Sequence, residues 1–329
     1  MLDRSMSPIP EPRLPAAESV AAFERVRRNE AALRPGVEAI CDRHALGAEP
    51  VARFADGSLP VYAVGAGRVL KLYPPCYPED VVAEAAALSL LGGRLPIPTP
   101  RIDATGELDG WRYILMERLP GVKLVEAWRE IEPEVRERLA EEIGAGLAAL
   151  HAVAVPDATP IPRPAWPAFL ASQRAGAVAR QRACGLADRW VDQIESFLAS
   201  TPLEETAPGA LLHTEVMREH FFVERTARGW RLSGLFDFEP AMIGAREYEF
   251  AAVGLFVSCG DARLLRRVMA GYGHPPSDTG PAFARRLLAY ALLHRYSNLP
   301  WYLKRIPPPA NAITLDALAD AWFSCGVDA

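Results

Sequence analysis

The chain contains 329 residues, of which 50% are apolar and 23% are charged, and its formal net charge is −5 at neutral pH. This length is sufficient for two domains with a sizeable core. The mild acidic balance argues against a nucleic acid as partner, and no stretch is apolar for long enough to predict a membrane-spanning helix.

The cysteines and the N-terminus predict a cytoplasmic protein. The N-terminus lacks the basic-then-apolar order of a signal peptide. The cysteines are odd in number, lie far apart and lack C-x-x-C spacing, which argues against a disulfide framework and against a zinc site. They are Cys41, Cys76, Cys184, Cys259 and Cys325.

The first part of the chain changes from helical to strand-like patterns. Residues 1–16 are proline-rich and lack periodicity, which predicts a disordered tail. Residues 17–33 have a helical pattern, a break is expected at Pro35-Gly36, and a second short helix is expected up to about residue 46. Turn residues then separate short apolar runs that predict strands at 51–54, 61–64 and 68–73.

Lys71 is an unusual residue in the last of these strands. The chain contains few lysines, namely Lys71, Lys123 and Lys304. Lys71 alternates with Leu70 and Leu72, so it points to the opposite face of the strand. One interpretation is a lysine that faces solvent. The other is a cation that bridges the α- and β-phosphates of a nucleotide.

Glu84 is the expected partner of Lys71. It is the only charged residue after Asp80 in the apolar stretch 81–91, which predicts a helix. A carboxylate that is buried there without a partner would be costly, so we expect an ion pair with Lys71. The alternative is an exposed helix residue without a special role.

The following segments become mostly helical. A proline-rich link at 96–100 leads into strands, the last of which ends at a Pro-Gly turn after Leu119. Pro133 begins a long amphipathic helix that ends near residue 153, and we interpret His151 at its end as structural rather than catalytic. Further helices are expected at 166–181, 187–200, 246–258, 262–270, 281–295 and 314–323.

The stretch 211–250 contains the strongest candidates for catalysis. Apolar runs alternate here with short polar inserts, a pattern typical of buried strands that hold catalytic loops. Phosphoryl transfer from a magnesium nucleotide needs one carboxylate to orient the nucleophile and another to hold the metal. The first insert contains His213, Glu215, Glu219 and His220, and the second begins with Asp237.

These residues resemble the motifs of the aminoglycoside phosphotransferase family, the small-molecule relatives of protein kinases. The family's catalytic loop reads H-x-D-x-x-x-x-N, and His213, Glu215 and His220 fall on its His, Asp and Asn positions. Asp237 falls on the metal-binding Asp of D-[FW]-x-x-A-x-x-G-x-x-x-Y-D-L-A, and Glu249 replaces a second Asp. The resemblance extends over nearly all of the chain from about residue 45.

The resemblance implies an α+β fold of the bilobal protein-kinase type. Residues 17–118 would form an N-lobe with leading helices and a small antiparallel sheet that binds the nucleotide. Residues 119–329 would form a mostly helical C-lobe with the catalytic loop and the helices that bind the acceptor.

The resemblance also implies a nucleotide site in the N-lobe. Lys71 and Glu84 would form the ion pair at the phosphates, and the turn that contains Ser58 would cover them. Backbone groups from Glu117 to Leu119 would meet the edge of the nucleobase. An Asp-Gly pair before Ser58 is also common in ordinary hairpins, so that turn has a purely structural alternative.

In the C-lobe, the resemblance implies that His213 braces the loop, that Glu215 accepts or orients the acceptor hydroxyl proton, and that Asp237 binds Mg²⁺. Glutamate is one methylene longer than aspartate, so the substrate or backbone must sit about 1 Å further back. Imidazole suits softer metals than Mg²⁺. His220, which falls on the metal-ligand Asn position and is a candidate for both catalysis and metal binding, would then contact a phosphate oxygen or a metal-bound water instead, with Glu219 or Glu239 supplying an oxygen ligand.

The expected activity is transfer of phosphate from Mg²⁺-bound ATP or GTP to a hydroxyl of a small-molecule antibiotic. The layout is similar to hygromycin-type actinobacterial antibiotic kinases, which implies a role in resistance. The acceptor is an aminoglycoside-like compound or a nucleoside antibiotic. The excess of arginine and lysine after Pro281 favours the latter, because polycations need an acidic cleft.

Two alternatives belong to other functional classes. A catalytically impaired relative would bind nucleotide or a small molecule without transferring phosphate, as the replacements at Glu215 and His220 would allow. A structural or interaction protein would bind no nucleotide. A hydrolase is poorly supported, because neither G-x-S-x-G nor H-E-x-x-H occurs.

Overall fold

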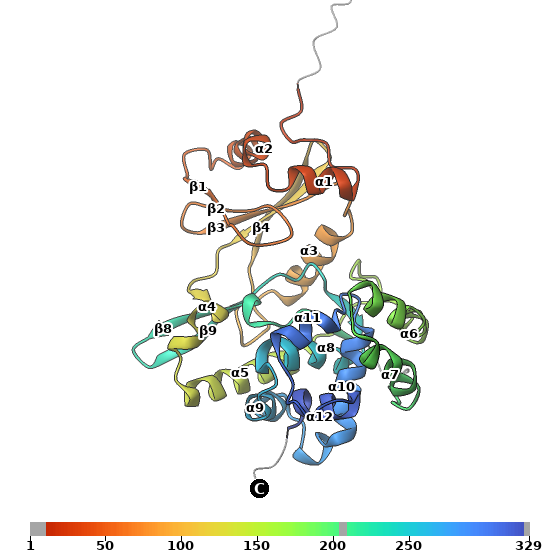
Figure 1. The fold of residues 1–329 in the computed structure, drawn as a ribbon. Coiled ribbons are helices and arrows are strands. Elements are labelled where there is room, and N and C mark those ends of the chain that lie inside the picture. Colours follow the sequence, from red (N-terminus) through yellow and green to blue (C-terminus); the bar gives the residue numbers. More distant parts are fainter. Residues whose placement is uncertain (1–10, 204–208, 326–329) are drawn as a thin grey trace, which may run out of the picture. The chain divides into compact units, whose positions relative to one another are not determined.

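The computed structural model describes residues 11–203 and 209–325. The chain divides into two compact units (Figure 1). The N-terminal unit contains the chain up to Ala85 together with Arg101–Arg118, and the C-terminal unit contains Ala86–Pro100 and the chain from Leu119 onward. The predicted α+β class is confirmed, with an antiparallel sheet in the first unit and a mostly helical second unit.

An antiparallel five-stranded sheet forms the centre of the N-terminal unit. Its order is β1-β2-β3-β5-β4, so β3 lies in the middle and pairs with β2 and β5. The predicted strands at 61–64 and 68–73 are confirmed. The strands are β1 (Val51–Arg53), β2 (Val61–Val64), β3 (Arg68–Tyr73), β4 (Ile102–Leu108) and β5 (Trp111–Glu117).

Two helices precede the sheet, and the break between them differs from the prediction. α1 (Val20–Val26) ends before Asn29, whose side chain accepts from the N–H of Ala32 and caps α2 (Glu30–Arg43). α2 continues through Pro35, so the expected break at Pro35-Gly36 is wrong. Packing of an apolar face stabilises a helix more than propensity does. The buried residues of this helix are Leu33, Gly36, Val37, Ile40 and Cys41.

Part of the predicted tail is packed. The N–H groups of Arg13 and Leu14 donate to Asp109 Oδ2 in the β4–β5 turn, at 2.6 and 3.0 Å. Leu14 is 2% exposed, and a Cβ at Gly36 would lie 2.3 Å from its side chain. The prediction of disorder is therefore wrong for residues 11–16, whereas residues 1–10 lie outside the described part of the chain.

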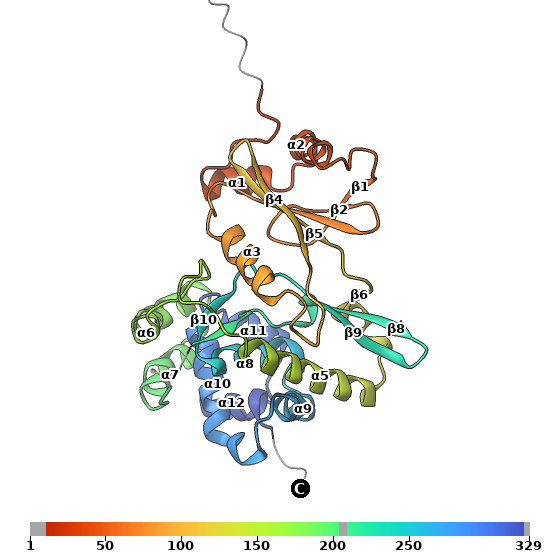
Figure 2. The same ribbon diagram turned by 180° about the vertical axis from the view of Figure 1, so that it is seen from behind.

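The C-terminal unit consists mostly of helices (Figures 1 and 2). None of the described helices is long and apolar enough to cross a membrane. The α-helices are α4 (Leu124–Ala127), α5 (Pro133–His151), α6 (Trp166–Ala183), α7 (Asp188–Ala199), α8 (Arg246–Ala252), α9 (Ala262–Tyr272), α10 (Pro281–Leu293), α11 (Leu299–Arg305) and α12 (Leu315–Phe323). Short turns of other helix types are η1 (Trp128–Glu130), η2 (Arg218–His220), η3 (Val253–Ser258) and η4 (Pro276–Asp278).

Glycines allow α5 and α9 to pack closely. A Cβ at Gly144 would lie 2.0 Å from the carbonyl oxygen of Val268, and a Cβ at Gly271 would lie 2.0 Å from that of Glu141. Only a residue without a side chain permits this approach of two backbones. The contact fixes α9 against the long helix that begins at Pro133.

Short strand pairs hold the two polar inserts of the stretch 211–250. β7 (Ala210–Leu212) pairs with β10 (Met242–Gly244), and β8 (Phe221–Thr226) pairs with β9 (Gly229–Leu235). The first insert therefore connects β7 to β8, and the second connects β9 to β10. Because each insert joins one strand of each pair, both loops are held at the same two places. β6 (Val122–Lys123) adds an edge to β8.

Candidate active site

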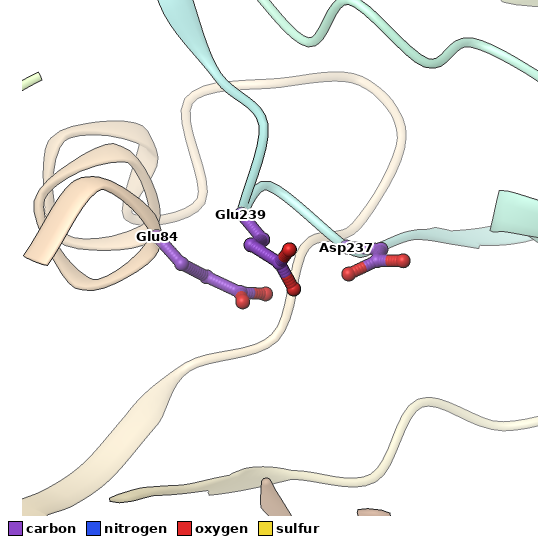
Figure 3. Close-up of side chains that lie close together, drawn as sticks. All are labelled: Glu84, Asp237 and Glu239. Atoms are coloured by element: carbon purple, nitrogen blue, oxygen red, sulfur yellow. The ribbon is translucent and has the colours of Figure 1, made fainter. Parts of the chain in front are cut away.

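The ion pair expected in the N-terminal unit is present. Lys71 Nζ lies 2.7 Å from Glu84 Oε2, and Tyr73 donates its hydroxyl to the same oxygen at 2.5 Å. Glu84 projects from α3 (Asp80–Leu91), as Figure 3 shows. Lys71 is 6% and Glu84 is 2% exposed, so the alternatives of a solvent-facing lysine and an exposed glutamate are wrong.

Burying the Lys71–Glu84 ion pair costs desolvation free energy, so a contribution to stability does not by itself explain its presence. Desolvation of two charges can exceed their mutual attraction, so buried pairs are weak evidence for stability. Tyr73 was not singled out from the sequence, although it lies two residues after Lys71 on the same face of β3. Its hydroxyl fixes the Glu84 carboxylate, which in turn fixes the lysine.

The other proposed nucleotide contacts lie at the expected elements. Ser58 is exposed in the turn between β1 and β2, next to Gly57 with φ of +115°. Glu117 ends β5, and its carboxylate accepts from Arg101 Nε at 3.1 Å. Leu119 is buried against Gly234 in the C-terminal unit. Their contacts with a nucleotide stay a prediction.

His213 has the surroundings of a bracing residue. The N–H of Glu215 donates to Nδ1 at 3.3 Å, so Nε2 carries the proton and donates to the carbonyl of Phe236 at 2.9 Å. Burial lowers the pKa of His213 to about 4, with the charge of His220 acting in the same direction. His213 is therefore neutral at physiological pH and connects the two polar inserts.

Glu249 holds the start of the candidate catalytic loop, residues 213–220, through both carboxylate oxygens. The N–H groups of His213 and Thr214 each donate to this carboxylate at 2.7 Å. His151 Nε2 lies 3.4 Å from Glu249, and its Nδ1 lies 2.8 Å from the Tyr272 hydroxyl. This buried position of His151 agrees with its interpretation as structural.

Thr214 is strained and is held from a second side. Its φ of +70° is unusual for a β-branched residue, and such strain persists only where surrounding contacts impose it. His294 Nε2 donates to the Thr214 carbonyl at 3.2 Å, and Arg295 donates to Thr214 Oγ1 at 3.2 Å and to the carbonyl of Pro240. The sequence contained no signal for these contacts of the α10–α11 segment.

His220 joins the backbone of Glu215 to the side chain of Asp237. Nδ1 lies 2.8 Å from the Glu215 carbonyl oxygen and therefore carries a proton, and Nε2 lies 3.3 Å from Asp237 Oδ2. Asp237 has a φ of +72°, a second non-glycine residue in the left-handed region. The structure thus brings together His213, Glu215, His220 and Asp237.

The oxygen donors of this group fit a magnesium ion. One carboxylate oxygen of Asp237 lies within 4.8 Å of one of Glu239, and Figure 3 shows both side chains on the segment between β9 and β10. Mg²⁺ prefers such hard oxygen ligands. Glu219, the other candidate oxygen donor, forms an ion pair with Arg305 at 3.1 Å.

The His220 ring is also oriented as a metal ligand would be. Ligating histidines usually donate their second ring N–H to a carbonyl or carboxylate, which directs the other nitrogen at the metal. His220 makes this bond to Glu215 and directs Nε2 at Asp237.

Comparisons with known proteins identify the family. The model of the phosphotransferase enzyme family matches residues 50–287. No curated protein matches the chain by sequence.

Solved structures of this family resemble the fold. The GDP complex of wild-type aminoglycoside 2′-phosphotransferase-IIIa has a TM-score of 0.67 and 19% identity, over 85% of this chain and 97% of its own. The streptomycin–ATP ternary complex of APH(2″)-IIa has a TM-score of 0.59 and 13% identity, over 82% and 94%. Macrolide 2′-phosphotransferase MphH from Brachybacterium faecium has a TM-score of 0.56 and 18% identity, over 84% of this chain and 99% of its own.

The family model covers well over half of the chain, and the sequence motifs, the sheet and the catalytic loop agree with it. The resemblance that the sequence predicted is thereby confirmed. The chain belongs to the phosphotransferase enzyme family.

Proposed function

We propose that this protein transfers the terminal phosphoryl group of ATP or GTP to a hydroxyl group of a small-molecule antibiotic. The observation that supports this most directly is the loop in which His220 links the Glu215 backbone to the Asp237 carboxylate. Similar solved structures include a GDP complex and an ATP complex of aminoglycoside phosphotransferases and the apoenzyme of a macrolide phosphotransferase. A cytoplasmic location and a role in antibiotic resistance are parts of the proposal.

In this mechanism the acceptor oxygen forms a bond to the terminal phosphorus while the bond to the bridging oxygen breaks. Glu215 orients the acceptor hydroxyl and receives its proton. Lys71, positioned by its ion pair with Glu84, binds the nucleotide phosphates. Asp237 and Glu239 would hold Mg²⁺, which when bound neutralises charge on the phosphates, and His220 lies beside Asp237. Most of the rate enhancement comes from positioning, which tolerates glutamate at position 215 if the loop is rigid.

The side chains near the catalytic loop support an acceptor that is not a polycation. Arg295 contacts the loop directly, and Arg305, which also pairs with Glu219, packs on the rings of Phe256 and Trp301. Trp301 is 45% and Tyr296 is 56% exposed. Exposed aromatic rings beside fixed guanidinium groups suit a planar, neutral or acidic compound. We therefore favour a nucleoside-type antibiotic over an aminoglycoside.

A relative that binds nucleotide without transferring phosphate is the second candidate. It is favoured by the replacement of the family's Asp and Asn by Glu215 and His220. Against it stand the buried Lys71–Glu84 pair and the strained backbone at Thr214 and Asp237, which all cost stability. In a protein without catalytic function, no activity would offset this loss of stability.

Mass spectrometry of phosphate transfer tests the proposal. The protein is incubated with Mg²⁺, ATP or GTP, and a panel of aminoglycoside, macrolide and nucleoside antibiotics. We expect one compound to gain the mass of a phosphate with wild type and with Asp192→Asn, an exposed control in α7, but not with Asp237→Asn.

Thermal unfolding separates the remaining outcomes. A rise in melting temperature with Mg²⁺-nucleotide but no transfer to any compound would support the non-catalytic binder. Neither transfer nor stabilisation by nucleotide would contradict both candidates.

A further inference from the structure

A cavity of about 400 Å³ lies within the C-terminal unit beside the catalytic loop. Its walls come from η1, the starts of α5 and α9, and Arg218 of η2. This volume falls in the range of small-molecule sites. Three arginines line the cavity, although the chain as a whole is acidic: Arg136, Arg218 and Arg263.

Two of these arginines have no acidic partner among the residues that the structure describes. Arg263 lies 3.6 Å from Glu137. Within residues 11–203 and 209–325, no carboxylate is at ion-pair distance from Arg136 or Arg218. Arg218 Nε donates to the carbonyl of Val257, whereas Arg136 Nε is buried without a hydrogen-bond partner. A buried donor of a charged group costs free energy until it finds an acceptor.

Trp128 holds both guanidinium groups at the cavity. The guanidinium carbon of Arg218 lies 3.4 Å from the centre of the indole ring, and that of Arg136 lies 5.1 Å from it. Positive charge thus accumulates here without full neutralisation.

The acidic residues at the cavity are already engaged. Glu137 pairs with Arg263 and with Arg267, the latter at 3.0 Å. Asp261 accepts from the N–H of Arg263 at 2.9 Å and caps α9. Pro133 lines the cavity, so the positive end of the 19-residue helix α5 also lies there, with Glu134 in its first turn.

We propose that this cavity binds a small molecule through a phosphate, sulfate or carboxylate group, with Arg136 and Arg218 donating to its oxygens. Bidentate guanidinium groups suit planar and tetrahedral oxyanions. Arg218 lies between Glu215 and His220 in the loop sequence, so a bound anion would also hold η2 in place. The anion is either an acidic group of the acceptor or a separate ion.

Titration calorimetry with inorganic pyrophosphate tests this site without nucleotide, metal or acceptor, so the result does not depend on the proposed activity. We expect Arg136→Gln to weaken binding about tenfold or more, because charged hydrogen bonds are lost. Arg129→Gln removes the same charge from an exposed position on η1 and should bind as wild type does.

The nucleotide phosphates provide the main competing site. The double variant Lys71→Met/Glu84→Gln removes the cation expected there and should still bind pyrophosphate. The inference is wrong if wild type binds no pyrophosphate, if Arg136→Gln binds equally well, or if the double variant alone loses binding.

Two further measurements complete the test. In phosphate-free buffer, Arg136→Gln should melt at the same temperature as wild type or higher, because an unpaired charge is removed; a lower melting temperature would indicate a structural role instead. Competition then identifies the source of the anion. An acidic acceptor that belongs in the cavity displaces pyrophosphate, whereas a separate ion stays bound beside every acceptor.

Discussion

His220 and Asp237 face each other across 3.3 Å. Because His220 donates its Nδ1 proton to a carbonyl, a neutral ring directs the lone pair of Nε2 at a carboxylate oxygen. Two acceptors at this distance repel each other unless a cation or a proton lies between them. Ligand atoms that share a cation at bond lengths near 2.1 Å lie roughly 3 Å apart. The pair is therefore suited either to share a proton or to bind one metal ion together.

We predict that His220 shifts the metal preference towards Mn²⁺. Imidazole binds Mn²⁺ better than Mg²⁺, since Mn²⁺ is a transition metal that accepts nitrogen ligands, whereas Mg²⁺ strongly prefers oxygen. His220→Asn should weaken Mn²⁺ binding by about tenfold and change Mg²⁺ binding little. Electron paramagnetic resonance of Mn²⁺, with Mg²⁺ as competitor, measures both affinities. His274→Asn is the control, and an equal Mn²⁺ affinity in His220→Asn would show that the ring is not a ligand.

Buried histidines should make the fold sensitive to mild acid. Burial lowers the pKa of both His213 and His294 to about 4, below the ordinary value of 6.5. Between these values the unfolded chain binds more protons, so the free energy of unfolding falls as pH decreases from 6.5 to 4. Each histidine should lower the free energy of unfolding by about 2 kcal/mol between pH 7 and pH 5.

Urea unfolding at several pH values measures this effect. His213→Gln is expected to be less stable than wild type at pH 7 but to lose less stability between pH 7 and pH 5. The control is His44→Gln in the N-terminal unit. Equal losses in His213→Gln and wild type would mean that His213 titrates normally in the folded state.

The candidate catalytic loop depends on elements that lie far apart in the sequence. Glu249 of α8 accepts from the loop backbone, and the α10–α11 segment holds Thr214 through His294 and Arg295. α5 and α9 support Glu249 in turn: His151 of α5 lies at hydrogen-bond distance from Glu249 and from Tyr272 of α9. The precision of the loop is therefore a property of packed helices.

The contact between α5 and α9 should tolerate no methyl group. Gly271→Ala would place a Cβ 2.0 Å from the Glu141 carbonyl, so we expect a loss of about 3 kcal/mol despite the better helix propensity of alanine. In Gly176→Ala of α6, the nearest atom to the new Cβ is Arg180 at 3.7 Å, and stability should rise by about 1 kcal/mol. Chemical denaturation measures both, and equal effects would contradict a close backbone contact.

Variants of the Lys71–Glu84 pair should change the stability of the whole molecule and its nucleotide binding independently. Lys71→Met leaves Glu84 buried and unpaired, which should cost about 3–5 kcal/mol. The double variant Lys71→Met/Glu84→Gln should recover most of this stability, because no charge remains buried. It should not recover the rise in melting temperature that ATP gives to wild type. Recovery of nucleotide stabilisation in the double variant would show that the pair does not bind phosphates.

The fold and much of the candidate site could be predicted because the relevant signals are local. Lys71 and Glu84 were recognisable as charges in apolar segments, and His213, Glu215, His220 and Asp237 by their spacing in loops between apolar strands. The packed segment at residues 11–16 and the continuous α2 were missed, because Leu14, Asp109 and Pro35 gain their places only from contacts with distant residues.

The order of the elements, the family and the candidate catalytic residues can be read from the sequence, since hydrophobic period and motif spacing are properties of neighbouring residues. How those residues are held depends on the tertiary structure. Glu249 accepts a hydrogen bond from Thr214, which is 35 residues away in the sequence, and Arg295 donates one to Thr214 from 81 residues away. The cavity with Arg136 and Arg218 likewise forms from segments that no local pattern connects. Such contacts depend on how helices pack, and packing is decided by the whole chain at once.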